Sequence, residues 1–241
     1  MADIEVRDVS VELGDPPRPI IDSCSMHCTS GTLTLVVGAN GCGKSVLLRT
    51  ILSLVSPTSG AIYLNGDNIS RRPRMLHEVT GVCFQNADLQ IFGDTVADDV
   101  ALGLRSDSPS GELNTENRSA ALIAEFGLSG HESDTPWTLS GGQRRRLALA
   151  GALAGPPQVL ILDEPFLELD YPSVKGLITS LSTFREGGGT VIMASHETRD
   201  IWPIVDQAVV MYDGRAIYTG SPEGAQPYII PAYGLRPIMG E

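Results

Sequence analysis

The fold of this chain is decided by the stretch Gly38-Ala39-Asn40-Gly41-Cys42-Gly43-Lys44-Ser45, which fits the pattern G-x-x-x-x-G-K-[ST]. It follows the apolar, β-prone run 33–37 and precedes an apolar run with helical spacing at 45–54. Glycines let the backbone N–H groups of such a turn converge on phosphate oxygens, and the N-terminus of the next helix adds a favourable partial positive charge. The sequence therefore predicts a strand, a phosphate loop (residues 38–45) and a helix.

The chemistry expected at the phosphate loop is the binding of a magnesium nucleotide. Lys44 would reach the β- and γ-phosphates, and the Ser45 hydroxyl would be offered to Mg²⁺. The residues expected to bind ATP here are Gly38, Asn40, Gly41, Cys42, Gly43, Lys44, Ser45 and Val46. The same N–H groups and helix terminus would favour the thiolate of Cys42, so alkylation is expected to block ATP binding and ATP to protect the thiol. The alternative is that Cys42 is an inert side chain that only fills space.

A second apolar run, residues 159–162, ends in Asp163 and Glu164. It reads as a buried parallel strand, and ligands bind at the carboxyl edge of a parallel sheet. We expect Asp163 to hold Mg²⁺ through water and Glu164 to polarise the attacking water. Such an ending is by itself equally typical of a strand cap, but the phosphate loop upstream favours the catalytic interpretation.

Composition excludes several function classes. The 241 residues carry a formal net charge of −12, which argues against general nucleic-acid or anionic-lipid binding, where contacts to phosphate dominate affinity. Only two of the 17 basic residues are lysines, which makes the position of Lys44 informative. The four cysteines and four histidines lack the spacing of a zinc site, and reduced thiols are expected. The charged start lacks the apolar region of a signal peptide, and no apolar run approaches the length of a membrane span.

The pattern of elements changes along the chain. Before residue 87 and after residue 155, short apolar strands alternate with helical patterns, as in an α/β core. Residues 87–155 carry helical patterns and no convincing strand, which indicates an inserted helical subdomain. The segment 221–241 is rich in Pro, Gly and Tyr and is interpreted as a short C-terminal appendage to a domain spanning residues 1–220.

A third motif, Leu139-Ser140-Gly141-Gly142-Gln143, stands about 20 residues before the Asp-Glu pair. Together with the phosphate loop it resembles the ATP-binding-cassette (ABC) ATPases over roughly residues 4–220. The resemblance implies a P-loop NTPase (RecA-like) α/β core with an N-terminal antiparallel β-subdomain and an inserted helical subdomain. In that family this signature motif (residues 139–143) of one protomer closes over the ATP held by another, which implies further ATP contacts from Ser140, Gly141, Gly142 and Gln143.

The remaining family elements follow in order. The resemblance implies that Gln85 senses Mg²⁺, water and the membrane partner, and that His196 contacts the γ-phosphate. It assigns catalysis to Glu164, His196 and Gln85, metal binding to Ser45, Gln85 and Asp163, and the dimer interface to Leu169 and Asp170. ATP and Mg²⁺ are the implied cofactors.

The runs Phe84–Phe92 and Thr95–Ala101 are similar to the energy-coupling-factor (ECF) branch, which also includes cobalt and nickel importers. This implies an ATPase on the cytoplasmic face of the membrane that powers vitamin or metal-ion uptake. Its implied partners are a second ABC ATPase, a transmembrane coupling protein and a substrate-binding membrane subunit, without nucleic acid. We expect Asp94, Asp98 and Asp99 to face a basic helix of the coupling protein, and a solvated acidic face without a partner is the other interpretation of these residues. The alternative is an ABC ATPase that remodels a non-membrane partner, as in iron–sulfur assembly.

Three positions depart from the family pattern. Leu13 stands where an aromatic residue commonly stacks on adenine, and no aromatic residue precedes Tyr63, so weak discrimination between nucleobases is expected. Val46 replaces the usual threonine after Ser45. The run Phe166–Asp170 is bulkier than the small residues usual before Leu-Asp, which is expected to alter the dimer interface.

Overall fold

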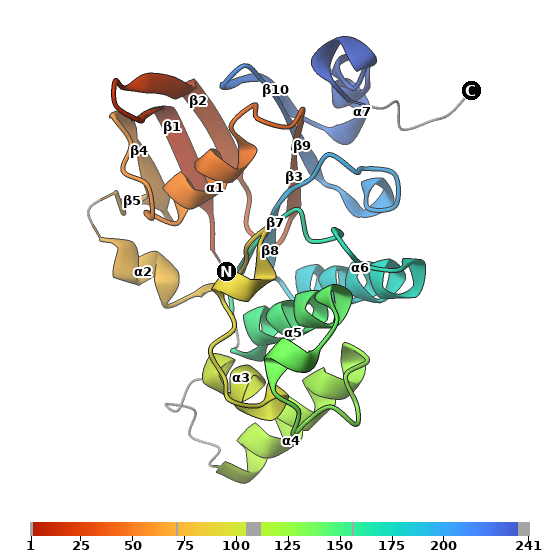
Figure 1. The fold of residues 1–241 in the computed structure, drawn as a ribbon. Helices are drawn as coiled ribbons and strands as arrows, with labels where there is room; N and C mark the ends of the chain where they lie inside the picture. Colours follow the sequence, from red (N-terminus) through yellow and green to blue (C-terminus); the bar gives the residue numbers. More distant parts are fainter. Residues whose placement is uncertain (1, 71, 105–111, 156, 236–241) are drawn as a thin grey trace.

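The computed structural model describes residues 2–70, 72–104, 112–155 and 157–235 (Figure 1). A six-stranded sheet has the order β10 (Arg215–Gly220), β9 (Gln207–Tyr212), β3 (Leu33–Gly38), β8 (Thr190–Ala194), β7 (Val159–Asp163) and β6 (Thr80–Cys83). A four-stranded sheet has the order β2 (Arg18–Cys28), β1 (Ile4–Leu13), β4 (Ser59–Leu64) and β5 (Asp67–Asn68). The α-helices are α1 (Lys44–Ile51), α2 (Pro73–His77), α3 (Val96–Gly103), α4 (Glu112–Glu125), α5 (Gly141–Ala154), α6 (Tyr171–Glu186) and α7 (Pro222–Ala225).

The larger sheet is parallel except for β10, which pairs antiparallel with β9. Its register fixes the site, because Ala194 of β8 lies opposite both Val36 of β3 and Asp163 of β7. The carboxyl ends of three strands therefore meet at one edge. The loops that leave this edge carry the phosphate loop, Glu164 and His196.

Strand β3 is buried along its whole length because both of its faces are covered. Leu35 and Val37 pack into a cluster with residues of α5 and α6, whereas Val36 packs into a second cluster with α1 and the four-stranded sheet. This two-sided burial explains why the strand is mostly apolar or β-branched and shows no alternation of apolar and exposed polar residues. The α/β core and the antiparallel N-terminal sheet predicted from the sequence are confirmed.

The described residues between β6 and β7 form helices joined by loops and contain no strand (Figure 1). Helix α3 begins with a reciprocal cap, in which the Thr95 hydroxyl and the Asp98 carboxylate each accept a backbone N–H from the other residue. Helix α5 packs against both α3 and α4 and has almost no amphipathic character, because its apolar residues are covered on several sides. This segment carries the signature motif at the start of α5.

The described part of the C-terminal segment folds back onto the core. Helix α7 packs against β9 and β10, and Ala225, Ile229 and Leu235 are buried. A Cβ atom on Gly234 would lie 2.6 Å from Cβ of Ala39, so this segment touches the phosphate loop. The last six residues of the expected appendage, 236–241, lie outside the described residues. Among the described residues, no helix combines the length and apolar character of a membrane span.

Candidate nucleotide-binding and catalytic site

The phosphate loop has the backbone conformation that its glycines allow. Gly41 and Gly43 have φ of +83° and +106°, a region that favours glycine, and Gly43 caps the N-terminus of α1. A Cβ on Gly43 would approach Ile21 Cδ1 to 2.7 Å, so the loop also packs tightly under β2. The first N–H groups of α1 have no partner within the helix, which makes this terminus suited to bind an anion.

Lys44 is buried at the first position of α1. Its Nζ donates to the carbonyl oxygens of Gly38 at 2.7 Å and Ala39 at 3.2 Å. The same Nζ lies 3.6 Å from Oε1 of Glu164. The structure therefore brings the lysine of the phosphate loop and the acid that follows β7 into one cluster, as the sequence predicted.

The surroundings of Asp163 fit a bound Mg²⁺. Its carboxylate is buried, and none of the described residues offers a hydrogen bond to Oδ1. Burial raises the pKa of Asp163, and the nearby Ser45 hydroxyl opposes that rise. An orphaned carboxylate oxygen beside a hydroxyl is the oxygen donor set that Mg²⁺ accepts, with water and phosphate completing the coordination.

Glu164 stands in a strained backbone conformation with φ of +48° and is only 7 % exposed. Its backbone N–H donates to the carbonyl of Ala194 at 2.8 Å, which holds the β7 end against the β8 end. Its Oε2 accepts from the backbone N–H of His196 at 3.2 Å and from Nδ1 of His196 at 2.9 Å. The histidine is thus oriented by the acid, with its other ring nitrogen left for a second partner.

The signature motif lies in a different cluster from the phosphate loop. The Ser140 hydroxyl accepts from the backbone N–H of Gln143 at 3.3 Å, and the Gln143 side chain accepts from the backbone N–H of Ser140 at 2.9 Å. This capping box defines the start of α5. Gln143 also contacts His131 Nε2 at 3.0 Å. No hydrogen bond described for these residues joins them to the phosphate loop of the same chain.

Gln85 is exposed on the loop after β6. It lines a pocket of about 340 Å³ with Gly141, Arg144 and Glu168. The expected dimer residues follow this pocket. Leu169 packs partly buried against the core, and Asp170 caps α6 by accepting from the backbone N–H of Ser173 at 3.0 Å. The Ser173 hydroxyl, together with this backbone N–H, lowers the pKa of Asp170.

Arg145 is a site residue that the sequence analysis missed. It is 2 % exposed, and its guanidinium donates to five backbone carbonyls from two loops, those of Phe84, Gln85, Asp163, Glu164 and Pro165. The bonds to Gln85 and Asp163 measure 2.9 Å. The arginine of α5 therefore fixes the backbone that carries Glu164. Its place in the run Arg144–Arg146 was the only signal in the sequence.

Two expectations from the sequence are wrong. Burial raises the pKa of the Cys42 thiol, and this effect outweighs the opposing charge of Lys44, so the thiolate is not favoured. Asp99 does not face a partner, because it is buried and its Oδ1 accepts from the backbone N–H groups of Phe92 and Gly93 at 2.7 and 2.9 Å. Asp94 and Asp98 are exposed, although Asp98 is engaged in the cap of α3.

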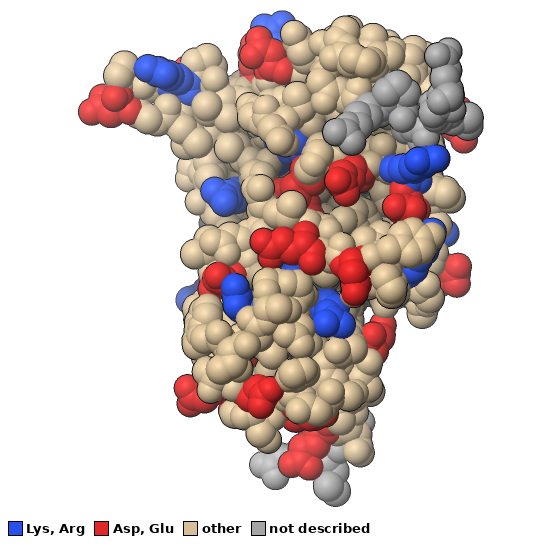
Figure 2. All heavy atoms as spheres, turned by 45° about the vertical axis from the view of Figure 1, so that its right-hand side comes forward, with Lys and Arg blue, Asp and Glu red and all other residues tan. Residues whose placement is uncertain are grey.

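The position expected to stack on adenine is partly open. Leu13 ends β1 and is 40 % exposed, and Val46 lies in the first turn of α1. On the face shown in Figure 2, acidic side chains surround isolated basic ones without a continuous basic patch among the residues drawn in colour. All four cysteines are free and buried, and the described residues contain no group of three or more potential metal-binding His, Cys, Asp or Glu side chains.

Known proteins with similar sequences and folds agree with this geometry. The ABC transporter family profile matches residues 21–167. An energy-coupling factor transporter ATP-binding protein, EcfA, of Methanothermobacter thermautotrophicus is 34% identical over 223 residues, 91% of this chain and 71% of the relative. A putative ABC transporter ATP-binding protein of Halobacterium salinarum is 32% identical over 235 residues, 97% of this chain and 99% of the relative.

Solved structures extend the comparison. CbiO1 of Clostridium perfringens, described as part of the ABC transporter complex CbiONQ, has a TM-score of 0.78 at 29% identity and covers 92% of this chain and 89% of its own. A dimeric bacterial ABC transporter cassette has a TM-score of 0.82 at 22% identity, covering 91% of this chain and 98% of its own, and supports the fold. The chain therefore belongs to the ABC transporter ATP-binding family, and its relatives place it with the ATPases of the energy-coupling-factor branch.

Proposed function

We propose that this chain hydrolyses MgATP in a closed dimer and thereby drives a membrane importer for a vitamin or a transition-metal ion. The observation that carries the proposal is the cluster of Lys44, Glu164 and His196 at the carboxyl edge of the sheet, beside the phosphate loop. Phosphoryl transfer to water requires a cation that binds the phosphate and an acid that orients the attacking water. Lys44 and the buried Glu164 supply these two groups, and Glu164 also orients His196.

The phosphate loop and Lys44 hold the β- and γ-phosphates, while Ser45, Asp163 and Gln85 provide oxygen atoms for the metal. Bound Mg²⁺ would neutralise charge on the phosphates. The buried and unpartnered Oδ1 of Asp163 supports this assignment. Gln85 is exposed on the loop after β6, and Arg145 donates to its backbone carbonyl at 2.9 Å.

Glu164 accepts a proton from the water that attacks the γ-phosphorus, and the bond to the β–γ bridging oxygen breaks. His196 stays hydrogen bonded to Glu164 and braces the γ-phosphate. Catalysis is then mostly positioning and charge stabilisation. The low exposure of Glu164 supports this role, since an acid shielded from bulk water interacts more strongly with its few neighbours.

The second half of each site comes from a partner ATPase, identical or related. Ser140, Gly141, Gly142 and Gln143 at the start of α5 close over the ATP held by the partner's phosphate loop. Leu169 and Asp170 form part of the interface. The separation of the signature motif from the phosphate loop within one chain supports this arrangement, because the helix terminus has no phosphate to bind in its own subunit.

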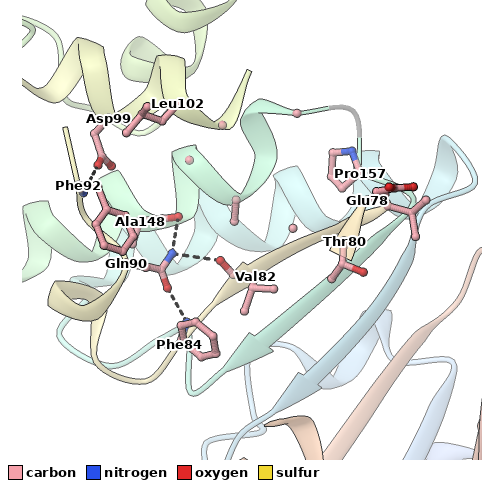
Figure 3. A pocket seen from close by; sticks show the side chains of 16 residues that line it. Glu78, Thr80, Val82, Phe84, Gln90, Phe92, Asp99, Leu102, Ala148 and Pro157 are labelled. Atoms are coloured by element: carbon pink, nitrogen blue, oxygen red, sulfur yellow. Dashed lines mark hydrogen bonds between the residues drawn. The ribbon is translucent and has the colours of Figure 1, made fainter. Parts of the chain in front are cut away.

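The membrane coupling protein docks in the groove shown in Figure 3, at the boundary between β6 and α3 and α5. The groove has a volume of about 330 Å³ and is lined by Phe84, Phe92 and Leu102. Phe92 and Leu102 are 77 % and 66 % exposed. A helix with apolar residues on one face and arginines at its edge, near the exposed Asp94, is the occupant that this surface suits.

The test of the ATPase assignment is Glu164→Gln. We expect the variant to bind ATP within about threefold of the wild-type affinity and to lose turnover by at least about 100-fold. Glu186→Gln, an exposed acid at the end of α6, is the control. Near-normal hydrolysis by Glu164→Gln would overturn the assignment.

The docking of the partner is tested separately. Co-purification from detergent-solubilised membranes should recover a coupling protein and a substrate-binding subunit with the full-length chain. The double variant Phe92→Ser and Leu102→Ser should lose them, whereas Leu54→Ser, which changes an exposed leucine after α1, should keep them. Recovery of a non-membrane partner alone would contradict the importer.

A further inference from the structure

Glu168 occupies an unusual position between β7 and α6. It is exposed, and its φ of +64° lies in the left-handed region that favours glycine. A charged residue in this conformation costs backbone strain that glycine would not. The carboxylate at this position is a property of this chain that neither the phosphate chemistry nor the groove of Figure 3 uses.

The Glu168 side chain lies directly on the signature motif. A Cβ on Gly141 would meet Oε2 of Glu168 at 2.7 Å and its Cδ at 3.3 Å. A Cβ on Gly142 would meet the Glu168 carbonyl oxygen at 2.8 Å. The two glycines therefore allow the Glu168 loop to approach the first turn of α5, and the carboxylate lies at the positive end of that helix.

The neighbouring charged groups leave the N-terminus of α5 as the positive group next to the Glu168 carboxylate. Helix α5 has no acidic residue in its own first turn. Arg144 forms an ion pair with Asp88 at 2.7 Å, and the guanidinium of Arg145 donates to backbone carbonyls. The ion pairs described for these two arginines do not include Glu168.

We propose that Glu168 is a built-in competitor of the γ-phosphate for the signature motif. The inference rests on the proposed function, in which the start of α5 receives the partner's ATP. When the partner's γ-phosphate approaches the N-terminus of α5, the Glu168 carboxylate must either move away or stay and repel it, because the two groups carry like charges. Glu168 therefore raises the ATP concentration at which the two subunits close, without touching the phosphate loop of its own chain.

The experiment measures ATP turnover against ATP concentration in the complex as purified from membranes. Glu168→Gln keeps the shape and removes the charge, Glu168→Gly also removes the backbone strain, and Glu186→Gln is the control. We expect Glu168→Gln to lower the half-maximal ATP concentration by roughly tenfold, and Glu168→Gly by at least as much. Raising the salt concentration should narrow the difference, because screening weakens the repulsion.

Binding of a fluorescent ATP analogue to the isolated chain should be unchanged by Glu168→Gln, since the competition operates only between subunits. An unchanged or raised half-maximal ATP concentration for turnover would overturn the inference alone. A complex in which neither Glu164→Gln nor Lys44→Ala reduces turnover would overturn the proposed function and the inference with it.

Discussion

Nδ1 of His196 lies 2.9 Å from Oε2 of Glu164, so the histidine and the acid at the ends of β8 and β7 form one unit. The ring donates through Nδ1, because a carboxylate can only accept, and Nε2 is left to face a ligand. A shift of either side chain would break this hydrogen bond. The backbone N–H of His196 donates to the same oxygen at 3.2 Å, which fixes the loop as well as the ring.

Replacing His196 with alanine should therefore impair turnover more than binding. We expect turnover to fall by about 100-fold or more, with ATP affinity changed by only a few-fold, since the phosphate loop stays intact. Steady-state kinetics and nucleotide titration measure the two effects. The exposed neighbour Glu197 provides the control Glu197→Gln. Equal losses in binding and turnover would show that His196 acts on the phosphate loop instead.

Arg145→Gln should destabilise the fold and slow catalysis together. Removing a guanidinium that donates to five backbone carbonyls, three of them in buried bonds, leaves several carbonyls without a partner, so the free energy of unfolding should fall by about 3 kcal/mol. Urea unfolding measures the loss, and turnover of the folded fraction should drop because the Glu164 backbone is released. The exposed Arg199, changed to Gln, should leave both quantities intact. Full turnover by the folded Arg145→Gln protein would show that Arg145 does not position the Glu164 backbone for catalysis.

Alkylation of Cys42 should be slow at neutral pH and accelerate steeply with pH. Its pKa is raised above the ordinary thiol value, so the reactive thiolate is scarce at pH 7 and increases tenfold for each pH unit below the pKa. Burial raises the pKa of Cys24 and Cys83 to about 11 and that of Cys28 to about 12, so these thiols should react later still. Mass spectrometry of the modified peptides, with and without MgATP, measures the order in which the cysteines react and the protection of Cys42 by the nucleotide. Rapid modification of Cys42 at pH 7 would contradict this prediction.

Nucleobase binding should be weak and easily improved. Wild-type affinities for ATP and GTP should agree within about a hundredfold, because Leu13 offers no aromatic face. Leu13→Tyr should strengthen ATP binding by about 1–2 kcal/mol, the contribution of one stacked base. Leu54→Tyr adds an aromatic ring elsewhere on the surface and serves as the control. An unchanged affinity in Leu13→Tyr would place the base away from the end of β1.

The parts of the site that follow local patterns could be predicted from the sequence. The phosphate loop, the two acids at the end of β7 and the start of α5 each depend on residues adjacent in the chain, where glycine conformations, strand burial and helix capping act. Strand β3 was recognisable because two covered faces favour a run of apolar and β-branched residues.

The missed features depend on residues far apart in the chain. Arg145 bonds to carbonyls, which every residue possesses, so its partners at 84–85 and 163–165 leave no pattern of side chains. The thiolate expected at Cys42 failed because burial by the surrounding chain outweighs the local helix terminus. Asp99 looked like a surface acid, but it folds inward to satisfy the N–H groups of the loop at Phe92 and Gly93.

The carbonyl partners of Arg145 also have an evolutionary consequence. The described hydrogen bonds of the Arg145 guanidinium go to backbone oxygens. Substitutions of the side chains at Phe84, Gln85 and Pro165 can therefore leave the hydrogen bonds between α5 and these loops in place. Side chains on this surface can therefore vary while α5 stays hydrogen bonded to the backbone that carries Glu164.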